Sequence, residues 1–228
     1  LRNDTGKQVL RNVYRQLPEG LRRAILVKRR ERLWIAGGVL FIHVPKAAGT
    51  SISQALYGRF MGHMRAADVE RWGSAQVRAL PRFGVVRNPW DRLVSAYRFA
   101  KRGSGVGGIV AGMYNPNQYR VPEFETFERF VHEWLAPRDI RRLDGVFQPQ
   151  WPFVCHANKQ VMVDHVGRFE ELEQTHAFLE AALRRKLRFH RQNLSGPEID
   201  YRSLYSPALA AAVRDIYSED VEFFGYEI

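Results

Sequence analysis

The sequence predicts an α/β domain in which helices flank a parallel sheet. Largely apolar runs at Val39–Ile42, Phe83–Arg87 and Val161–Phe169 are typical of strands that are buried on both faces. Segments with helical periodicity separate these runs, and strands that alternate with helices favour a parallel sheet. Ligands of such sheets bind beyond the carboxyl ends of the strands, so function is expected at that rim.

Helical spacing and turn signals predict the other elements. Residues 1–36 are expected to form one or two basic helices, broken near Pro18 and Gly20. The glycine-rich stretch Lys101–Pro122 is expected to be the least regular, with Lys101–Gly112 either a lid or a loop without a role. Further expected elements are helices at Ile52–Tyr57, Trp90–Ala100, Glu123–Leu135 and Glu171–Lys186, a fourth strand at Leu187–Asn193, and a last helix capped by Ser206.

Length and composition limit the class of protein. The chain has 228 residues and 45% apolar content, which is ordinary for a globular protein with a sizeable core. No run of about 18 apolar residues is present, so no transmembrane helix is predicted. Cys155 is the single cysteine, so the fold needs no internal disulfide and a reduced cytoplasm is the expected compartment.

Positive charge is concentrated at the start of the chain. The net charge is +11, and residues 1–36 hold ten Lys or Arg against three Asp or Glu. We therefore divide the chain into a basic helical N-terminal extension, 1–36, and a main domain, 37–228. A basic surface favours polyanions, which include nucleic acid, anionic lipid, acidic polysaccharide and a phosphate-rich cofactor. The extension is expected either to pack as a solvated helix or to contact a membrane surface or an anionic partner.

The stretch Leu40–Ser51, LFIHVPKAAGTS, predicts an anion site. An apolar strand leads into a loop of small residues and then into a helix, an arrangement that points backbone N–H groups at an anion. Lys46 adds a point charge beside them. This loop of N–H groups, together with Lys46, could hold one phosphate.

Arg87 follows the second expected strand and predicts a second anion site, because its planar fork suits phosphate. Two anion sites on one rim suggest a nucleotide with phosphates at its 5′ and 3′ positions. A P-loop NTPase is the obvious rival, but its lysine follows the second glycine of the motif, whereas Lys46 precedes Gly49. Val44 also stands where the first glycine is required, and no strand clearly ends in an aspartate for Mg²⁺.

The same two segments resemble the sulfotransferase family that depends on 3′-phosphoadenylyl sulfate (PAPS). Residues 40–51 resemble its 5′-phosphosulfate loop, and 87–97 (RNPWDRLVSAY) resemble its 3′-phosphate segment, including the eight-residue step from Arg87 to Ser95. The variant is most similar to the carbohydrate type, which includes heparan 2-O- and chondroitin sulfotransferases and their bacterial relatives. Residues 166–172 and 217–226 resemble later blocks of that group, so the resemblance spans roughly residues 39–226.

This resemblance implies a P-loop-NTPase-like sulfotransferase fold and a reaction. The sulfuryl group of PAPS would pass in line to a hydroxyl or amine of an acceptor, releasing PAP, without a required metal. Lys46 would stabilise the leaving phosphate, and Arg87 and Ser95 would bind the 3′-phosphate. The residues implied to hold the 5′-phosphate are Pro45, Lys46, Ala48, Gly49, Thr50 and Ser51. The implied acceptor is an acidic or neutral glycan or another hydroxylated molecule, and no nucleic acid is expected. A eukaryotic chain with a trimmed N-terminus would belong in the Golgi lumen.

The acceptor hydroxyl needs a general base, and histidine is the usual choice near neutral pH. His63 resembles the Gly-His step that carries the base in the heparan 2-O group, with Asp68 or Glu70 as substitutes. His43 is expected to be a structural residue. His132 and His176 are expected to be packing or surface residues, and Gln148 and Gln150 either contact a sugar or are ordinary polar surface residues. Arg191, Asn193 and Ser195 either form a loop that closes over the nucleotide or end a strand.

Two other functions stay open from the sequence. One is a nucleotide kinase or NTPase, which would show Mg²⁺-dependent ATP hydrolysis and no PAP binding. The other is a non-catalytic polyanion binder that acts through the basic N-terminus, whose salt-sensitive binding would survive loss of Lys46.

Overall fold

A computed structural model describes residues 14, 16–105, 116–186 and 200–228. Its centre is a three-stranded parallel sheet in the order β1-β2-β3. The strands are β1 (Leu40–Ile42), β2 (Arg82–Val86) and β3 (His165–Arg168). Phe41 pairs with Phe83, and Gly84 pairs with Val166, so the three carboxyl ends lie at one edge. The predicted α/β architecture is confirmed.

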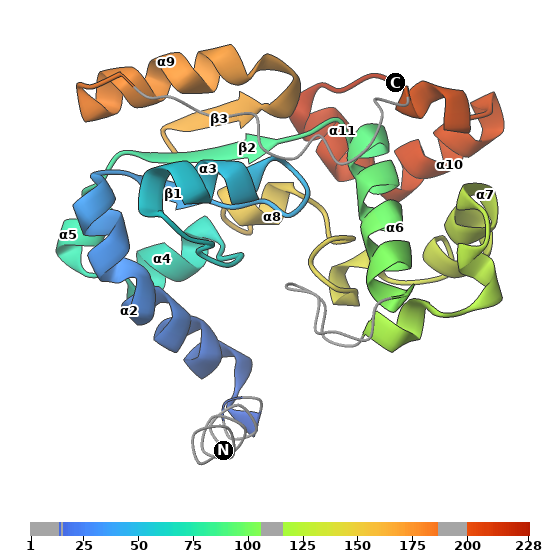
Figure 1. The fold of residues 1–228 in the computed structure, drawn as a ribbon, viewed down its shortest axis with the longest axis horizontal. Helices are drawn as coiled ribbons and strands as arrows, with labels where there is room; N and C mark the ends of the chain where they lie inside the picture. Colours follow the sequence, from blue (N-terminus) through green and yellow to red (C-terminus); the bar gives the residue numbers. More distant parts are fainter. Residues whose placement is uncertain (1–13, 15, 106–115, 187–199) are drawn as a thin grey trace.

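Helices surround the sheet, and several of them gather beyond the carboxyl ends of the strands (Figure 1). Those at that end are α6 (Pro89–Gly105), α10 (Pro207–Ile216) and α11 (Ser218–Phe224). The helices are α2 (Glu19–Gly37), α3 (Gly49–Tyr57), α4 (Ala66–Trp72), α5 (Ala75–Arg78), α6 (Pro89–Gly105), α7 (Phe127–Arg129), α8 (Trp151–Val154), α9 (Leu172–Leu183), α10 (Pro207–Ile216) and α11 (Ser218–Phe224). Short 3₁₀ turns lie at Pro116–Tyr119, Pro122–Phe124, Ile140–Arg142, Phe169–Glu171 and Tyr201–Leu204, and a π-helix at Phe130–Leu135.

Helix α2 packs against the rest of the domain. Val27 and Trp34 are fully buried in the same core as the sheet. Arg30 donates to the carbonyl of Met61 at 3.1 Å, and Glu31 accepts from the backbone N–H of Ser74 at 2.7 Å. The helix begins directly after Pro18, so Gly20 lies inside its first turn and does not break it.

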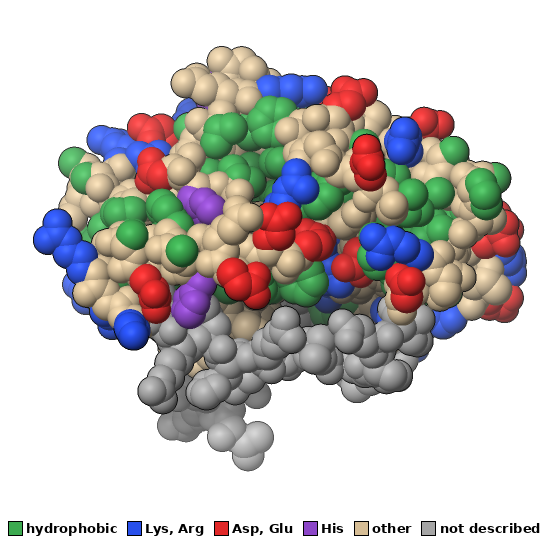
Figure 2. All heavy atoms as spheres, turned by 90° about the horizontal axis from the view of Figure 1, so that it is seen from above, with side chains coloured by type: hydrophobic (Ala, Val, Ile, Leu, Met, Phe, Trp, Pro, Cys, Tyr) green, Lys and Arg blue, Asp and Glu red, His purple; other side chains and the backbone are tan. Residues whose placement is uncertain are grey.

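On the face shown in Figure 2, basic and acidic side chains are intermixed and form no single basic patch.

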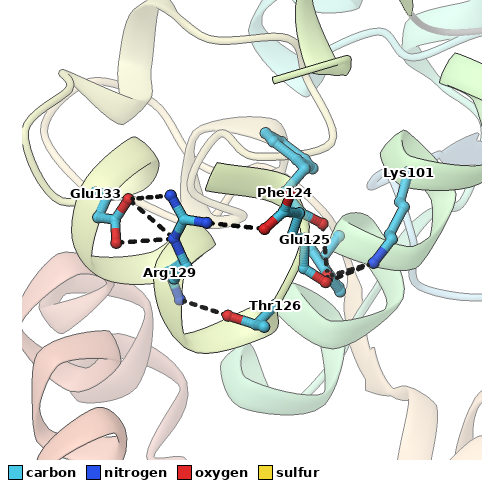
Figure 3. A network of polar contacts seen from close by, with 7 residues as sticks. Lys101, Phe124, Glu125, Thr126, Arg129 and Glu133 are labelled. Atoms are coloured by element: carbon cyan, nitrogen blue, oxygen red, sulfur yellow. Dashed lines mark hydrogen bonds and ion pairs between the residues drawn. The ribbon is translucent and has the colours of Figure 1, made fainter. Parts of the chain in front are cut away.

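Two expected helices have different limits in the structure. Helix α6 continues to Gly105, so the start of the glycine-rich stretch is helical. Lys101 anchors this last part by donating to the carbonyl of Glu125 at 2.7 Å (Figure 3). The expected helix Glu123–Leu135 is instead three short helical pieces, because Thr126 accepts from the N–H of Arg129 and starts a new turn. The predicted strand at 187–193 and residues 106–115 of the predicted loop lie outside the described residues.

Candidate active site

The loop between β1 and α3 has a backbone that ordinary residues seldom adopt. Lys46 has φ 68° and Ala48 has φ 59°, both in the left-handed region. Ala48 is the N-cap of α3, which therefore begins at Gly49, earlier than the sequence predicts. The first turn of an α-helix has N–H groups without intrahelical acceptors, so it provides donors for an anion. Thr50 is exposed at this turn and Ser51 is half-buried.

Gly49 is required by close packing at this helix start. A Cβ added there would lie 1.8 Å from Cδ2 and 2.0 Å from Nε2 of His43. The imidazole of His43 is itself buried and stacks on Phe41 with ring centroids 5.6 Å apart. His43 therefore has the structural role that the sequence predicts, since its ring packs against Gly49 in the first turn of α3.

We expect Gly49→Ala to destabilise the protein by about 1–3 kcal/mol, because the new methyl group must displace the His43 ring. The same change at Gly20, where a Cβ meets nothing within 4 Å, should be neutral or stabilising by up to about 1 kcal/mol. Urea unfolding of the two variants compares them directly. Equal stability of Gly49→Ala and wild type would contradict this packing argument.

Arg87 brings the two predicted anion segments together. Its Nε and Nη2 donate to the two carboxylate oxygens of Asp91 at 2.8 and 2.7 Å. Its Nη1 donates to the carbonyl oxygen of Lys46 at 3.2 Å, and its guanidinium lies 4.2 Å from the ring centroid of Phe169. Each nitrogen of the fork therefore has a protein partner, and an incoming phosphate has to compete with Asp91 for it.

The backbone of Arg87 is held as firmly as its side chain. Gln150 is fully buried and accepts from the Arg87 N–H at 2.9 Å while donating to the Arg87 carbonyl at 2.7 Å. Asp220, also fully buried, accepts from the N–H groups of Gln150 and Trp151. Gln150 therefore holds the backbone at the end of β2. The prediction that it contacts a sugar or is a polar surface residue is wrong, because its side chain is fully buried.

Lys46 lies in a positively charged environment. Its Nζ is 4.2 Å from the ring centroid of Phe99. Burial, together with the charges of Arg87, Arg102 and Arg92, lowers the pKa of Lys46 to about 8. A charged lysine whose pKa is lowered by burial and by neighbouring cations is stabilised by binding an anion, which is the chemistry that the loop geometry also indicates.

His63 lies next to His43, the residue that follows β1. Its Nδ1 is 3.1 Å from the carbonyl oxygen of His43, and the two rings are 4.3 Å apart. This contact fixes Nδ1 as the protonated nitrogen and leaves Nε2 as the proton acceptor. Burial, with the charges of Arg92 and Lys46, lowers the pKa of His63 to about 4, so the ring is neutral at physiological pH.

Ser95 lies on α6 one turn beyond Asp91, and residues four apart share one face of a helix. Its side chain is half-buried on the face that carries the partner of Arg87. Arg191, Asn193 and Ser195 lie outside the described residues, so their placement stays a prediction.

Both carboxylates considered as substitute bases are paired with an arginine. Glu70 pairs with Arg82 at 2.8 Å, and Arg82 begins β2, at the opposite end of the strand from Arg87. Asp68 accepts from Arg23 and from the N–H of Arg65, which starts α4. His132 is exposed and His176 half-buried, each on a helical segment, as expected.

Sequence reasoning missed the residues that hold the rim in place. Asn88 donates its backbone N–H to Glu170 at 2.7 Å, and Tyr226 donates to the other oxygen of Glu170 at 3.0 Å. Arg168 packs on the ring of Tyr226, with its guanidinium carbon 4.6 Å from the centroid. The two late sequence blocks therefore act as a clamp on the turn that follows Arg87. Their distance along the chain gave no local signal of this contact.

A parallel sheet, a small-residue loop entering a helix, and basic side chains at the strand ends are typical of α/β proteins that bind phosphorylated or sulfated ligands. The model of the sulfotransferase family matches residues 36–227, so the chain belongs to that family, whose general activity is sulfuryl transfer. A search of curated proteins and a search of solved structures each found no match. No helix within the described ranges is long and apolar enough to cross a membrane. Those ranges also hold no group of three His, Cys, Asp or Glu side chains placed to bind a metal.

Proposed function

We propose that this protein transfers the sulfuryl group of PAPS to a hydroxyl or amine of a carbohydrate-type acceptor and releases PAP. One observation carries the proposal. The hydrogen bond from Arg87 to the Lys46 carbonyl places two basic segments, 41 residues apart in sequence, on one rim. A nucleotide with phosphates at both its 5′ and 3′ positions has the charges to engage both at once.

The residues at the rim fit such a nucleotide. Gly49 leaves the start of α3 without a side chain, and the left-handed residues Lys46 and Ala48 turn the loop around that start. Lys46 and the first turn of α3 would hold the 5′-phosphosulfate, while Arg87 and Ser95 would hold the 3′-phosphate. When bound, PAPS supplies an activated sulfuryl group attached to a good leaving phosphate.

Catalysis would then be a matter of charge and position. Lys46 stabilises the negative charge that builds on the bridging oxygen as the sulfur–oxygen bond breaks. His63 accepts the proton of the acceptor at Nε2, because its Nδ1 donates to the His43 carbonyl. The pKa values of about 4 for His63 and about 8 for Lys46 leave the base neutral and the lysine charged between those limits. A bell-shaped pH profile of kcat/KM with those two limbs is expected.

The acceptor class and the setting are proposals that rest on the family resemblance. We propose an acidic or neutral glycan as acceptor and a bacterial, carbohydrate-type enzyme of the cytoplasm. The basic N-terminal residues would provide peripheral contact with a membrane or a polyanion. Titration calorimetry with PAP, with ATP as the control, tests the cofactor. PAP binding without Mg²⁺ supports the proposal, whereas Mg²⁺-dependent ATP hydrolysis without PAP binding would favour an NTPase.

We expect His63→Ala to remove at least about 10²-fold of turnover while leaving PAP affinity within about threefold of wild type. The reason is that the imidazole contacts the His43 carbonyl and would act on the acceptor, whereas the nucleotide would be held by Lys46, Arg87 and Ser95. Turnover is measured as PAP formed from PAPS with desulfated heparin and chondroitin as probe acceptors. His132→Ala, at an exposed histidine, is the matched control. Wild-type turnover in His63→Ala would remove His63 as the base.

A further inference from the structure

Arg92 differs from the other basic residues at the rim because it is buried. It lies in the first turn of α6 and is only 1% exposed. Its Nε donates to the Pro45 carbonyl at 2.9 Å, and its Nη2 donates to the Gln148 carbonyl at 2.8 Å. Because the side chain is enclosed by protein, its contacts are with the chain itself and not with a ligand.

The contact with Pro45 supports a strained peptide. The next residue, Lys46, has φ 68°, and a left-handed conformation costs a non-glycine residue roughly 1–2 kcal/mol. Arg92 holds the carbonyl before this residue, and Arg87 holds the carbonyl of Lys46 itself. Two successive carbonyls of the loop are therefore fixed by two different arginines. A phosphate that draws Arg87 away leaves Arg92 as the remaining anchor of the pair.

The second contact leads toward the candidate base. The side chain of Gln148 accepts from Arg65 at 3.1 Å and donates to the Leu143 carbonyl at 2.7 Å. Arg65 comes two residues after His63. Arg92 and Gln148 thus connect the loop that carries Lys46 with the segment that carries His63.

We propose that Arg92 is a positioning residue for sulfuryl transfer, whose buried guanidinium holds Lys46 in a fixed place relative to His63. This inference rests on the proposed function. It concerns kcat more than nucleotide affinity, because a misplacement of about 1 Å at the reacting groups can cost about 10²-fold in rate. It assigns a role to an arginine that the sequence motif contains but that does not face the nucleotide.

The charge of Arg92 supports the same role. Within the described residues Arg92 has no ion-pair partner, and burial lowers its pKa against the opposing influence of Tyr217 and Asp220. An arginine in this state is costly to bury, so a close-packed apolar side chain would be the simpler choice for stability alone. Retaining the charge keeps both the carbonyl contacts and a positive field at the site.

That field acts on His63. The titratable or charged groups around its ring are His43, Lys46 and Arg92, while Arg30 of α2 is bonded two residues away at Met61. Arg92 and Lys46 both lower the pKa of His63, so removing the charge of Arg92 should raise it. The titration of His63 therefore reports whether the charge of Arg92 reaches the candidate base.

The test compares Arg92→Lys, which keeps the charge, with Arg92→Gln, which removes it. We expect turnover of PAPS with the probe acceptors to fall about 10²-fold in both, with PAP affinity by calorimetry within about threefold of wild type. The imidazole titration of His63, followed by NMR, should move to higher pH in Arg92→Gln and stay in place in Arg92→Lys. Arg82→Lys, at the far end of β2, is the matched control and should match wild type in all three measurements.

Several outcomes would overturn the proposal. Turnover within threefold of wild type in both variants would do so, as would a loss of PAP affinity that matches the loss of turnover.

If either variant fails to fold, Gln148→Ala tests the proposal instead. This change removes the side-chain contact with Arg65 and leaves the buried charge of Arg92 in place. It should lower turnover about tenfold at unchanged PAP affinity, and wild-type turnover would overturn the proposal. Wild-type protein that binds no PAP would instead refute the proposed function itself.

Discussion

Lys46→Ala is expected to lower turnover of PAPS by at least about 10²–10³-fold, the largest effect on kcat of any single change at the rim. The ammonium group is the one flexible cation of the loop between β1 and α3, where charge would build on the leaving phosphate. Its pKa of about 8 means that it is already partly deprotonated in mildly alkaline solution.

The pH dependence makes the Lys46 prediction specific. The pKa of Lys46 is lowered, so the charged form is complete well below pH 8 and is lost as pH rises through about 8. We expect kcat/KM for PAPS to fall over the same range, because this ratio follows the free enzyme. Lys46→Arg stays charged and should retain partial activity with that alkaline limb absent. A limb that persists in Lys46→Arg would assign it to another group.

Arg87→Ala is expected to produce the largest loss of nucleotide affinity. Arg87 and Asp91 form a half-buried, hydrogen-bonded charge pair, and losing one partner of such a pair at a binding site costs about 2–5 kcal/mol when it is well desolvated. A loss near the lower end, roughly 30-fold or more in PAP affinity, is therefore expected. The loss has two causes: the phosphate loses a bidentate donor, and Asp91 is left unpaired beside the phosphate. Calorimetry with PAP measures the effect.

The double variant Arg87→Ala, Asp91→Asn separates these two causes. Part of the affinity should return, because the repelling carboxylate is gone while the missing donor is not restored. Arg82→Ala is the control, since Arg82 and Arg87 stand at opposite ends of the same strand and only Arg87 lies at the rim. Equal loss of PAP affinity in Arg82→Ala and Arg87→Ala would mean that the effect is general destabilisation and not a phosphate contact.

The comparison of Gln150 with Arg87 shows how far sequence reasoning reaches. Arg87 was predicted from a local pattern, an apolar strand that ends in a basic residue. Gln150 looks like an ordinary polar residue in an irregular stretch, yet it is fully buried and bonds both backbone groups of Arg87. Its partner is 63 residues away, and such a pairing leaves no period or spacing in the sequence.

The N-terminal helix gives a second example. Helical spacing predicted basic helices over residues 1–36, and α2 is one. The excess of Lys and Arg suggested an extension that either packs as a solvated helix or contacts a membrane surface or an anionic partner. In the structure Trp34 is fully buried in the core, and Arg30 bonds the carbonyl of Met61, two residues before His63. Charge counts describe the exposed face of a helix and say little about the few apolar residues that dock it.

The sequence by itself determined the alternation of strands and helices, the anion loop around Lys46, the strand-end position of Arg87 and the sulfotransferase resemblance. These are local features, set by short runs of residue types and by their spacing. Only the tertiary structure decided that Arg87 bonds the Lys46 carbonyl, that His63 rests on His43, and that Arg92 anchors Pro45. Those contacts join segments 20 to 47 residues apart, and folding brings them together because parallel strands end at a common edge.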